Sequence, residues 1–416
     1  MKYTLPRGTK DILPDEVGIW QFIEETCRRI FEVYNYAEIR TPIFEITDLF
    51  ARAVGSTTDI VTKEMYTFKD KKGRSLTLRP EATASVVRAG IQNNLISPDK
   101  ITKLYYFGPM FRYERPQAGR YRQFSQAGVE VFGSSDPLVD VEIIEMAVRL
   151  FETLGLKDLE VDINSVGCKK CQPAFRDKLK TYFKDIKKNL CKDCQERLEY
   201  NPLRILDCKN EKCQKYIGEA PASIDTLCKE CKLNFKEVTE YLKSFAIKFK
   251  INSRLVRGLD YYTRTTFEVV SKVLGAQNAV CGGGRYDNLV EELGGKSTPA
   301  SGFAIGIERV VEVMKSFNLQ SPVSNPQLFI AVMGEEAKKK GFELLSEARR
   351  GGIKADIDYT GKTLKAQMKT ADRLKSRYTY IIGEEELRKG KGLLKNMEDG
   401  SQKEVSFTEL VAFLKR

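Results

Sequence analysis

The sequence contains no histidine, and this absence narrows the chemistry that the chain can carry out. None of its 416 residues is a histidine. Without an imidazole the chain has no histidine general base, no Ser-His-Asp triad and no metal site with a histidine ligand. Any catalysis must therefore rely on carboxylates, arginine, tyrosine or cysteine.

Long apolar runs are also missing. Nowhere do about 18 apolar residues follow one another without a charge, which is the length that a membrane-spanning helix needs. The first residues, MKYTLPRGTKDILPDE, lack an apolar segment of signal-peptide length. We therefore expect a cytoplasmic protein with no membrane partner.

Length and charge suggest several domains and an anionic partner. A chain of 416 residues is too long for one ordinary core, so two or three domains are expected. Lys and Arg outnumber Asp and Glu by 69 to 57, which gives a formal charge of +12. Such a surplus favours a polyanion such as nucleic acid, although a Lys-rich surface without a partner explains the charge equally well.

The cysteines are strongly clustered. Eight of the ten lie between positions 168 and 231, in four pairs at metal-ligand spacing. In a reducing cytoplasm such pairs hold zinc as tetrahedral thiolate sites more often than they form disulfides. Eight thiolates suffice for two four-cysteine sites or for one site with spares, metal-free thiols are the alternative, and the spacing leaves the pairing open. The candidate ligands of a structural zinc are Cys168, Cys171, Cys191, Cys194, Cys208, Cys213, Cys228 and Cys231.

The apolar pattern over the first three quarters of the chain predicts an antiparallel sheet with helices. Residues 16–33 have the pattern of an amphipathic helix. The segments EMYTFKD, SLTLRPE and KLYYFGPMFRYE alternate apolar and polar residues, as antiparallel strands do. Residues 166–240 are rich in lysine and cysteine and predict a helical insertion.

The pattern changes after a Pro/Ser/Asn-rich linker at 318–327. Expected strands then alternate with expected helices, which signals a small α/β domain with a parallel component. The expected elements are a strand in LFIAVMG, a helix over 335–350, a strand in IKADIDY, a helix over 363–375 and a strand in YTYIIGEEEL.

Two segments combine arginine, tyrosine and glycine residues: RGLDYYTRT at 257–265 and GGGRYD at 282–287. Taken singly, the first fits an amphipathic strand and the second a mobile glycine turn. In this order they resemble the two histidine-specific segments of histidyl-tRNA synthetases, a family of class II aminoacyl-tRNA synthetases. The pair predicts a pocket for a small polar substrate.

Other stretches resemble the same family. FRYERPQAGRYRQF at 111–124 resembles class II motif 2, two strands around a loop that hold ATP and the acceptor end of tRNA. AEIRTPIFEITDLF at 37–50 resembles motif 1, which builds a dimer interface, and SGFAIGIERVVEVM at 301–314 resembles motif 3. The stretch 358–386 resembles the anticodon-binding domain. There the residues expected to face phosphates are Lys362, Lys365, Lys369, Arg373 and Lys375, although a solvated helix face explains any single one of them better.

The resemblance implies an α+β fold of two domains. A class II antiparallel-sheet catalytic domain would span 1–320, interrupted by a Cys-rich, mainly helical insertion at 166–240. An α/β anticodon-binding domain would span 321–416. A homodimer is implied as well.

The resemblance also implies roles for individual residues. The catalytic residues would be Arg257, which bridges the substrate carboxylate and the α-phosphate, and Arg112, which neutralises the α-phosphate. ATP would be bound by Arg112, Glu114, Arg120, Phe124 and Arg309. Histidine would be bound by Glu81, Thr83, Gln126, Glu130, Tyr261, Tyr262 and Tyr286. Arg115, Gln117 and Arg122 of the motif 2 loop would read the acceptor end.

The implied reaction has two steps. Histidine attacks the α-phosphorus of ATP, accompanied by Mg²⁺, and the tRNA terminal ribose hydroxyl then takes the histidyl group. A carboxylate is already an adequate nucleophile, so no general base is needed and the barrier lies in charge repulsion and positioning. That chemistry suits a chain without histidine.

Several alternatives compete with this interpretation. GGKS at 294–297 and GKT at 361–363 imitate a Walker A loop, but Val290 and Asp356 stand where its first glycine must be. The sequence has no strand-GxGxxG-helix unit, which argues against a dinucleotide-binding enzyme. A non-charging regulatory paralogue that senses histidine is the main rival, but such paralogues typically lack the anticodon domain and several catalytic residues. A zinc-dependent nucleic-acid-binding protein explains the cysteines and the charge but leaves the pocket without a purpose.

Overall fold

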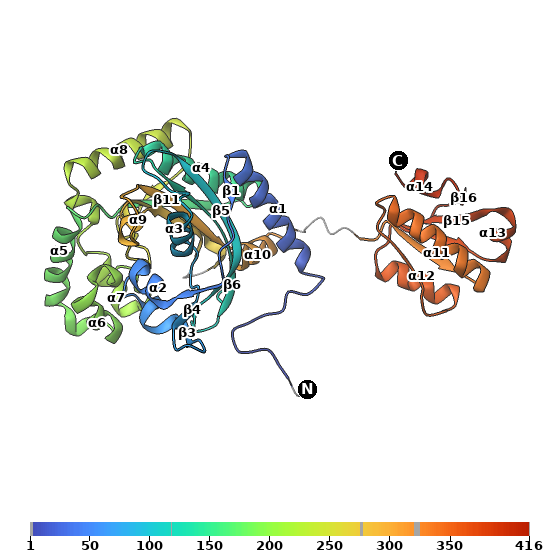
Figure 1. The fold of residues 1–416 in the computed structure, drawn as a ribbon, viewed down its shortest axis with the longest axis horizontal. Coiled ribbons are helices and arrows are strands. Elements are labelled where there is room, and N and C mark those ends of the chain that lie inside the picture. Colours follow the sequence, from blue (N-terminus) through green and yellow to red (C-terminus); the bar gives the residue numbers. More distant parts are fainter. Residues whose placement is uncertain (1–2, 118, 275–277, 320–324, 416) are drawn as a thin grey trace. The chain divides into compact units, whose positions relative to one another are not determined.

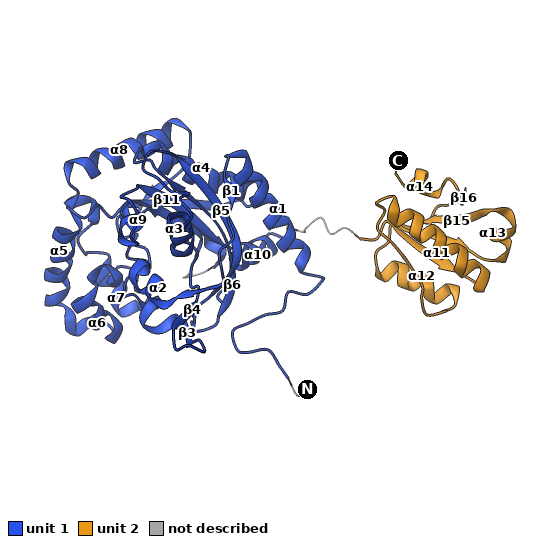
Figure 2. Ribbon diagram, in the orientation of Figure 1, with its two compact units in different colours: residues 1–321 blue, residues 322–416 orange. Residues whose placement is uncertain are grey.

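The structure is a computed structural model that describes residues 3–117, 119–274, 278–319 and 325–415. Its chain forms two compact units, Met1–Ser321 and Pro322–Arg416 (Figure 2). The expected domain boundary between 320 and 321 lies outside the described residues. Among the described helices, none is both long and apolar enough to cross a membrane.

The first unit is built on a sheet that is antiparallel across most of its width, as expected (Figure 1). Its strand order is β1-β5-β6-β11-β10-β9-β7-β8. Neighbours from β5 to β7 are antiparallel, whereas the two edge pairs, β1 with β5 and β7 with β8, are parallel and were not anticipated. The strands are β1 Ala37–Glu38, β5 Thr102–Phe111, β6 Gln123–Phe132, β7 Leu159–Ser165, β8 Lys250–Ile251, β9 Thr263–Ser271, β10 Ala279–Arg285 and β11 Ala300–Gly306.

Apolar faces of helices cover this sheet and form its core. In α1 the buried residues Trp20, Ile23, Cys27 and Ile30 recur every three or four positions, which places them on one helix face. The helix expected over 16–33 is thereby confirmed. The helices that pack here are α1 Val17–Val33, α4 Pro137–Thr153, α8 Lys229–Ser244 and α10 Ile307–Ser316, with a 3₁₀ turn at Lys272–Leu274.

A three-stranded antiparallel sheet, ordered β2-β4-β3, contains two of the expected strands. Residues paired across strands share a sheet face, so Phe44 opposite Leu78 and Phe68 opposite Leu76 lie on one side. The elements of this region are β2 Phe44–Ile46, β3 Tyr66–Lys69, β4 Ser75–Leu78, α2 Thr47–Val54, α3 Thr83–Gln92, α9 Leu289–Glu292 and a π-helical turn at Ile60–Glu64.

The cysteine-rich segment forms the predicted helical insertion between β7 and β8. Its last helix, α8, continues past the expected end at 240, because Leu242 is fully buried and still belongs to the core face. The insertion contains α5 Gln172–Asp185, α6 Lys192–Tyr200, α7 Glu211–Ile217 and α8, with 3₁₀ turns at Lys187–Asn189, Pro202–Ile205 and Ser223–Thr226.

The second unit is an α/β sheet ordered β13-β12-β14-β15-β16. The predicted parallel component is confirmed by β13-β12-β14. The antiparallel hairpin β15-β16 was not predicted, although the Asp399-Gly400 pair, with Gly400 at φ 73°, gives a turn signal. The elements are β12 Leu328–Val332, α11 Glu335–Arg350, β13 Ala355–Ile357, α12 Leu364–Arg373, β14 Tyr378–Ile382, α13 Glu384–Lys389, β15 Lys391–Asn396, β16 Gln402–Ser406 and α14 Leu410–Leu414.

Candidate active site

Two adjoining cavities lie on the large sheet. One has a volume of about 230 Å³ and the other about 60 Å³, and both are lined by Arg112, Gln126 and Arg257. The larger, here called the outer cavity, is lined by all the residues expected to bind ATP: Arg112, Glu114, Arg120, Phe124 and Arg309. The smaller, here called the inner cavity, is lined by all those expected to bind histidine: Glu81, Thr83, Gln126, Glu130, Tyr261, Tyr262 and Tyr286.

The β5-β6 hairpin carries one wall of the outer cavity. Its strands pair up to Phe111 opposite Gln123, so the motif 2 segment forms two strands around a loop as predicted. Within that segment, Ala118 lies outside the described residues. The hairpin fixes its polar side chains on a rigid, paired scaffold.

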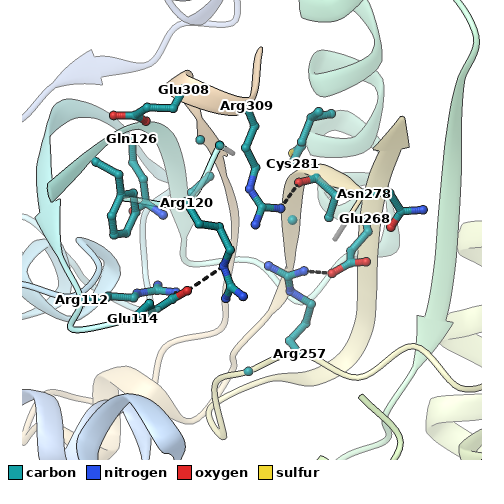
Figure 3. Close-up of a pocket in the computed structure, with 18 of the residues that line it drawn as sticks. Arg112, Glu114, Arg120, Gln126, Arg257, Glu268, Asn278, Cys281, Glu308 and Arg309 are labelled. Atoms are coloured by element: carbon teal, nitrogen blue, oxygen red, sulfur yellow. Dashed lines mark hydrogen bonds and ion pairs between the residues drawn. The ribbon is translucent and has the colours of Figure 1, made fainter. Parts of the chain in front are cut away.

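One carboxylate orients two arginines on this hairpin. Oε2 of Glu114 lies 2.6 Å from Nε of Arg120, and its Oε1 lies 3.8 Å from Nη1 of Arg112 (Figure 3). Nε of Arg112 also donates to the carbonyl oxygen of Pro80 at 2.8 Å. The guanidinium carbon of Arg112 lies 5.3 Å from the ring centre of Phe124. These contacts pre-organise cations where an anion can enter.

Arg257 lies where the cavities meet and is held by an ion pair. Its Nη1 contacts Oε1 of Glu268, on β9 (Figure 3). Burial opposes the charge of the guanidinium, but Glu268 and Tyr262 hold the pKa of Arg257 above its ordinary value. Its Nε is buried and has no hydrogen-bond partner among the described residues. An oriented, permanently charged side chain of this kind suits an anionic substrate.

The glycines of β10 and β11 make room for these charged groups. A Cβ atom at Gly282 would lie 2.1 Å from Nη2 of Arg257. At Gly302 a Cβ would lie 2.1 Å from Oε2 of Glu130. Both distances are far below van der Waals contact, so a side chain at either position would displace the charged group beside it.

Arg309 and Glu308 close the far side of the outer cavity (Figure 3). Nη1 of Arg309 donates to the carbonyl oxygen of Ala279 at 2.5 Å. Burial and the charge of nearby Arg120 lower the pKa of Arg309 to about 10. Burial also raises the pKa of Glu308 to about 7, although its two oxygens accept from the backbone N–H of Ser125 at 2.8 and 3.0 Å. The close cations favour an anionic ligand.

Glu130 is the central group of the inner cavity. Thr83 Oγ1 donates to its Oε1 at 2.7 Å, and the Tyr286 hydroxyl donates to its Oε2. Burial raises the pKa of Glu130 to about 8 despite these hydrogen bonds, and the nearby carboxyl of Glu81 adds to the increase. A carboxyl group poised between its charged and neutral forms can either donate to or accept from a ring nitrogen.

The rest of the inner cavity offers acceptors and aromatic walls. Glu81 is buried, its oxygens accept from the backbone N–H groups of Thr83 and Ala84 at 2.8 and 2.9 Å, and burial raises its pKa. Oε1 of Gln126 is buried without a hydrogen-bond partner among the described residues. The ring of Tyr261 lies 4.8 Å from that of Tyr262 and 5.4 Å from that of Tyr286. A cavity of about 60 Å³ has space for about four to six water-sized groups, the scale of a small side chain.

The three loop residues expected to read the acceptor end line neither cavity among the described residues. These are Arg115, Gln117 and Arg122. The guanidinium carbon of Arg122 lies 3.7 Å from the ring centre of Tyr113, and its backbone N–H donates to Gly8 at 2.7 Å. Arg122 thus packs on the loop and the amino-terminal segment.

Sequence reasoning missed four charged residues of the outer cavity, namely Asp207, Lys209, Glu268 and Glu308. Glu268 follows the first signature segment by three positions, and Glu308 immediately precedes Arg309. Strand alternation gave no signal for Glu268, because a separation of three positions places it on the opposite strand face from Thr265. Asp207 and Lys209 gave no signal either, since the insertion was expected to be structural.

The cysteines form two groups of four, which resolves the pairing left open by the spacing. One contains Cys168, Cys171, Cys228 and Cys231, and the other contains Cys191, Cys194, Cys208 and Cys213.

Both groups have the geometry of a metal site. Within each group all four sulfurs lie within 4.8 Å of one another. Recorded Sγ–Sγ separations are 3.8 Å from Cys168 to Cys171 and 3.8 Å from Cys191 to Cys208. Four thiolates about 2.3 Å from a tetrahedral zinc ion would lie about 3.8 Å apart. Each group can therefore hold one metal ion.

In the second unit, the five expected phosphate-facing residues are all exposed, namely Lys362, Lys365, Lys369, Arg373 and Lys375. Lys365 and Lys369 line a shallow groove together with Met368, Lys395 and Met397.

Comparisons with known proteins cover both units. A family model described as histidyl-tRNA synthetase matches residues 8–171 and 203–310, and one described as anticodon binding domain matches 327–416. The histidine–tRNA ligase of Desulforamulus reducens is 53% identical over 416 residues, covering 100% of this chain and 99% of that protein. That of Halothermothrix orenii is 53% identical over 412 residues, covering 99% and 98%.

A solved structure agrees with this. The crystal structure of apo S. aureus histidyl-tRNA synthetase is similar with a TM-score of 0.83 and 40% identity, covering 100% of both chains. The family match spans most of the first unit, and the identity to relatives extends over the full length. The chain belongs to the histidyl-tRNA synthetase family.

Proposed function

We propose that the protein attaches histidine to its cognate tRNA, using ATP and a histidyl-adenylate intermediate. The observation that carries this proposal is the junction of the two cavities, where Arg112 and Arg257 line both. An amino acid in the inner cavity and a nucleotide in the outer one would meet at these two arginines.

In the first step the histidine carboxylate attacks the α-phosphorus of ATP and pyrophosphate leaves. Two anions must approach each other, so positioning and charge neutralisation lower the barrier. Arg257 bridges the carboxylate and the α-phosphate, held by Glu268. Arg112 neutralises the charge that builds on the α-phosphate, held by Pro80 and Glu114.

The outer cavity binds ATP. Phe124 offers its ring to adenine on the face away from Arg112, while Glu114 and Arg120 position the nucleotide. Arg309 holds the far phosphates; burial and the charge of nearby Arg120 lower its pKa, and a bound anion would stabilise its charged form. Mg²⁺ accompanies the phosphates as the hard cation that such oxygens prefer.

The inner cavity selects histidine. Glu130 and Tyr262 contact the two imidazole nitrogens, while Tyr261 and Tyr286 form aromatic walls. Glu81, Thr83 and Gln126 receive the α-amino group, and the unpartnered Oε1 of Gln126 supplies a free acceptor. An analogue without ring nitrogens would leave buried polar groups unpaired, so it should be rejected steeply.

In the second step the tRNA terminal ribose hydroxyl attacks the carbonyl carbon of the histidyl-adenylate, takes the histidyl group and releases AMP. The match of 327–416 to an anticodon-binding domain supports tRNA as the partner. The exposed basic residues of α12 and its flanks suit phosphate contacts there. Arg115, Gln117 and Arg122 contribute to the acceptor end from the motif 2 loop, outside the two cavities.

The working form is a homodimer. The face of the small sheet that carries Phe44, Ile46 and Phe68 is apolar, and these side chains are 46%, 56% and 44% exposed. Contiguous exposed apolar groups on one sheet face mark an interaction surface. They lie on or beside the motif 1 segment, the part of the family associated with dimer formation.

Each cysteine group holds one structural zinc ion. Four thiolates with sulfurs spaced for a tetrahedral ion leave no open position for catalysis. The ions would cross-link segments of the insertion that are far apart in the chain, in a protein that works in the reducing cytoplasm.

Transfer of labelled histidine to tRNA tests the proposal. We expect acid-stable label on tRNA only when ATP, Mg²⁺ and histidine are all present. A protein that binds histidine and ATP but never charges tRNA would instead be the regulatory paralogue, against which the match of residues 327–416 to an anticodon-binding domain argues. Binding of tRNA without use of ATP would favour the zinc-dependent nucleic-acid-binding protein.

A further inference from the structure

One turn of the insertion carries both a cysteine of the second group and two residues of the outer cavity. Asp207 and Lys209 line that cavity, and Cys208 between them belongs to the group with Cys191, Cys194 and Cys213. The residues that would hold a metal and those that face the substrate are thus adjacent in the chain.

The position of this turn depends on the Cys208 sulfur. The turn, residues 206–210, joins the 3₁₀ segment Pro202–Ile205 to α7. Sγ of Cys208 lies 3.8 Å from Sγ of Cys191, and it accepts from the backbone N–H of Asn210 at 3.4 Å. Four close thiolates repel one another without a cation and become a rigid cross-link with one. A bound metal ion would therefore fix residues on both sides of Cys208.

The preceding segment is tied to the catalytic core. Nη2 of Arg197 lies 2.5 Å from Oδ2 of Asp59, and Nδ2 of Asn201 donates to Oδ1 of Asp260 at 2.8 Å. Asp260 belongs to the first signature segment. The sulfur contacts of Cys208 and these polar contacts of the preceding segment thus both hold the turn beside the cavity.

Lys209 has the chemistry of a phosphate contact. Its ammonium group is 3.5 Å from Asp207, but both side chains are substantially exposed, at 49% and 38%. An exposed ion pair of this kind is weak, so the flexible side chain can exchange Asp207 for a phosphate oxygen. It would do so at the rim of a cavity that already contains Arg112, Arg120 and Arg309.

We infer that Lys209 binds the ATP polyphosphate and that a metal ion in the second cysteine group holds it in place. Affinity for ATP therefore depends on metal occupancy of that group. This inference rests on the proposed function, because it takes ATP to be the ligand of the outer cavity.

The lysine is tested by Lys209→Ala in histidine-dependent pyrophosphate exchange. Loss of one charge-assisted contact should raise KM for ATP about tenfold, with KM for histidine little changed. Lys212→Ala is the matched control, because Lys212 is also exposed, lies three positions away and lines neither cavity. Lys209→Arg should keep most of the ATP affinity.

The role of the metal is tested by Cys194→Ser, which removes one metal ligand and leaves residues 206–210 of the turn unchanged. Bound zinc should fall from two ions per chain to one, and KM for ATP should rise as in Lys209→Ala. Adding Lys209→Ala to Cys194→Ser should raise KM little further, because both changes remove the same contact. In Cys231→Ser, which loses the other ion, Lys209→Ala should keep its full effect.

The outcomes separate this inference from the proposed function. Absence of histidine-dependent exchange in the unaltered protein would refute the proposed function. Normal exchange together with equal KM values for Lys209→Ala and Lys212→Ala would overturn the role of Lys209 alone. Fold-changes for Lys209→Ala and Cys194→Ser that multiply in the double variant would overturn the coupling to the metal. If Cys194→Ser does not fold, the comparison of the two lysine variants still decides the role of Lys209.

Discussion

At the scale of single residues, Glu130 shows how burial prepares a side chain for its ligand. Its two oxygens already accept from Thr83 and Tyr286, and burial raises its pKa to about 8. Below that pH the carboxyl group carries a proton, whereas free imidazole loses its own proton above about pH 6.5. Between these values the protein and histidine together hold one proton, which a hydrogen bond between them can share.

We therefore expect kcat/KM for histidine to be bell-shaped in pH. Below about pH 6.5 the Glu130 carboxyl group and the imidazole of histidine both carry a titratable proton, and above about pH 8 neither does. Binding therefore weakens at both acid and alkaline pH. Glu130→Gln cannot ionise and should lose the alkaline limb while keeping the acid limb. Pyrophosphate exchange between pH 5.5 and 9.5 measures both; an unchanged alkaline limb in the variant would assign it to another group.

Arg257 gives a second residue-scale prediction. Arg257→Ala should reduce adenylate formation by about a hundredfold or more while largely sparing the fold, because the arginine stabilises charge in the reaction. Single-turnover activation and thermal unfolding measure the two effects. Near-normal activation in a folded variant would remove Arg257 from the mechanism. Lys272→Ala is a suitable control, because Lys272 is an exposed cation that lines neither cavity.

The sequence predicted the cavity residues better than it predicted their partners. Every residue expected to bind ATP or histidine lines the cavity assigned to it, because the motifs name side chains directly. Glu268 was missed because its contact with Arg257 depends on how the residues between Arg257 and β9 fold back against that strand. Such a partnership is set by tertiary structure and leaves no local pattern.

At the scale of elements, Gly282 of β10 leaves room for the guanidinium of Arg257 beside the strand. Gly282→Ala would put a methyl group 2.1 Å from the present position of Arg257 Nη2. The end of a flexible side chain can move aside, so we expect a folded protein whose kcat for exchange falls at least about tenfold. Gly218→Ala is the control, because its nearest neighbours would be 3.8 Å away. Equal activity of the two variants would mean that the position of Arg257 is unimportant.

Elements with strong local patterns were predictable, whereas those that depend on distant partners were not. The buried stripe of α1 was visible in the sequence, and β5 was expected as a strand, although its burial does not alternate because Leu104, Tyr105 and Tyr106 are all buried. The cysteine pairing was not, because α8 brings Cys228 and Cys231 back to Cys168 and Cys171 across about 60 residues. The parallel edge pairs of the large sheet also join segments far apart in the chain.

At the scale of the whole molecule, the apolar face of the small sheet predicts self-association. Phe44→Asp with Phe68→Asp would place charges on that face and should convert a dimer to monomers, as measured by sedimentation velocity. Phe245→Asp, at a comparably exposed phenylalanine 59% accessible elsewhere in the first unit, should leave the dimer intact. Dissociation by both changes alike, or by neither, would place the interface on another surface.

The two units have different tasks in the proposed reaction. The first contains both cavities and so should activate histidine, while the second matches an anticodon-binding domain and so should contribute to tRNA binding. Activation therefore needs no tRNA in this scheme, and the specificity for histidine lies within the inner cavity.

The central claim is that the two cavities activate histidine with ATP. Exchange of labelled pyrophosphate into ATP tests it, with histidine and each other amino acid assayed separately. It requires the junction at Arg112 and Arg257, the ATP site and the inner cavity together. We predict rapid exchange with histidine and none above background with the others. No exchange with histidine, in folded protein shown to bind it, would contradict the activation chemistry proposed for these cavities.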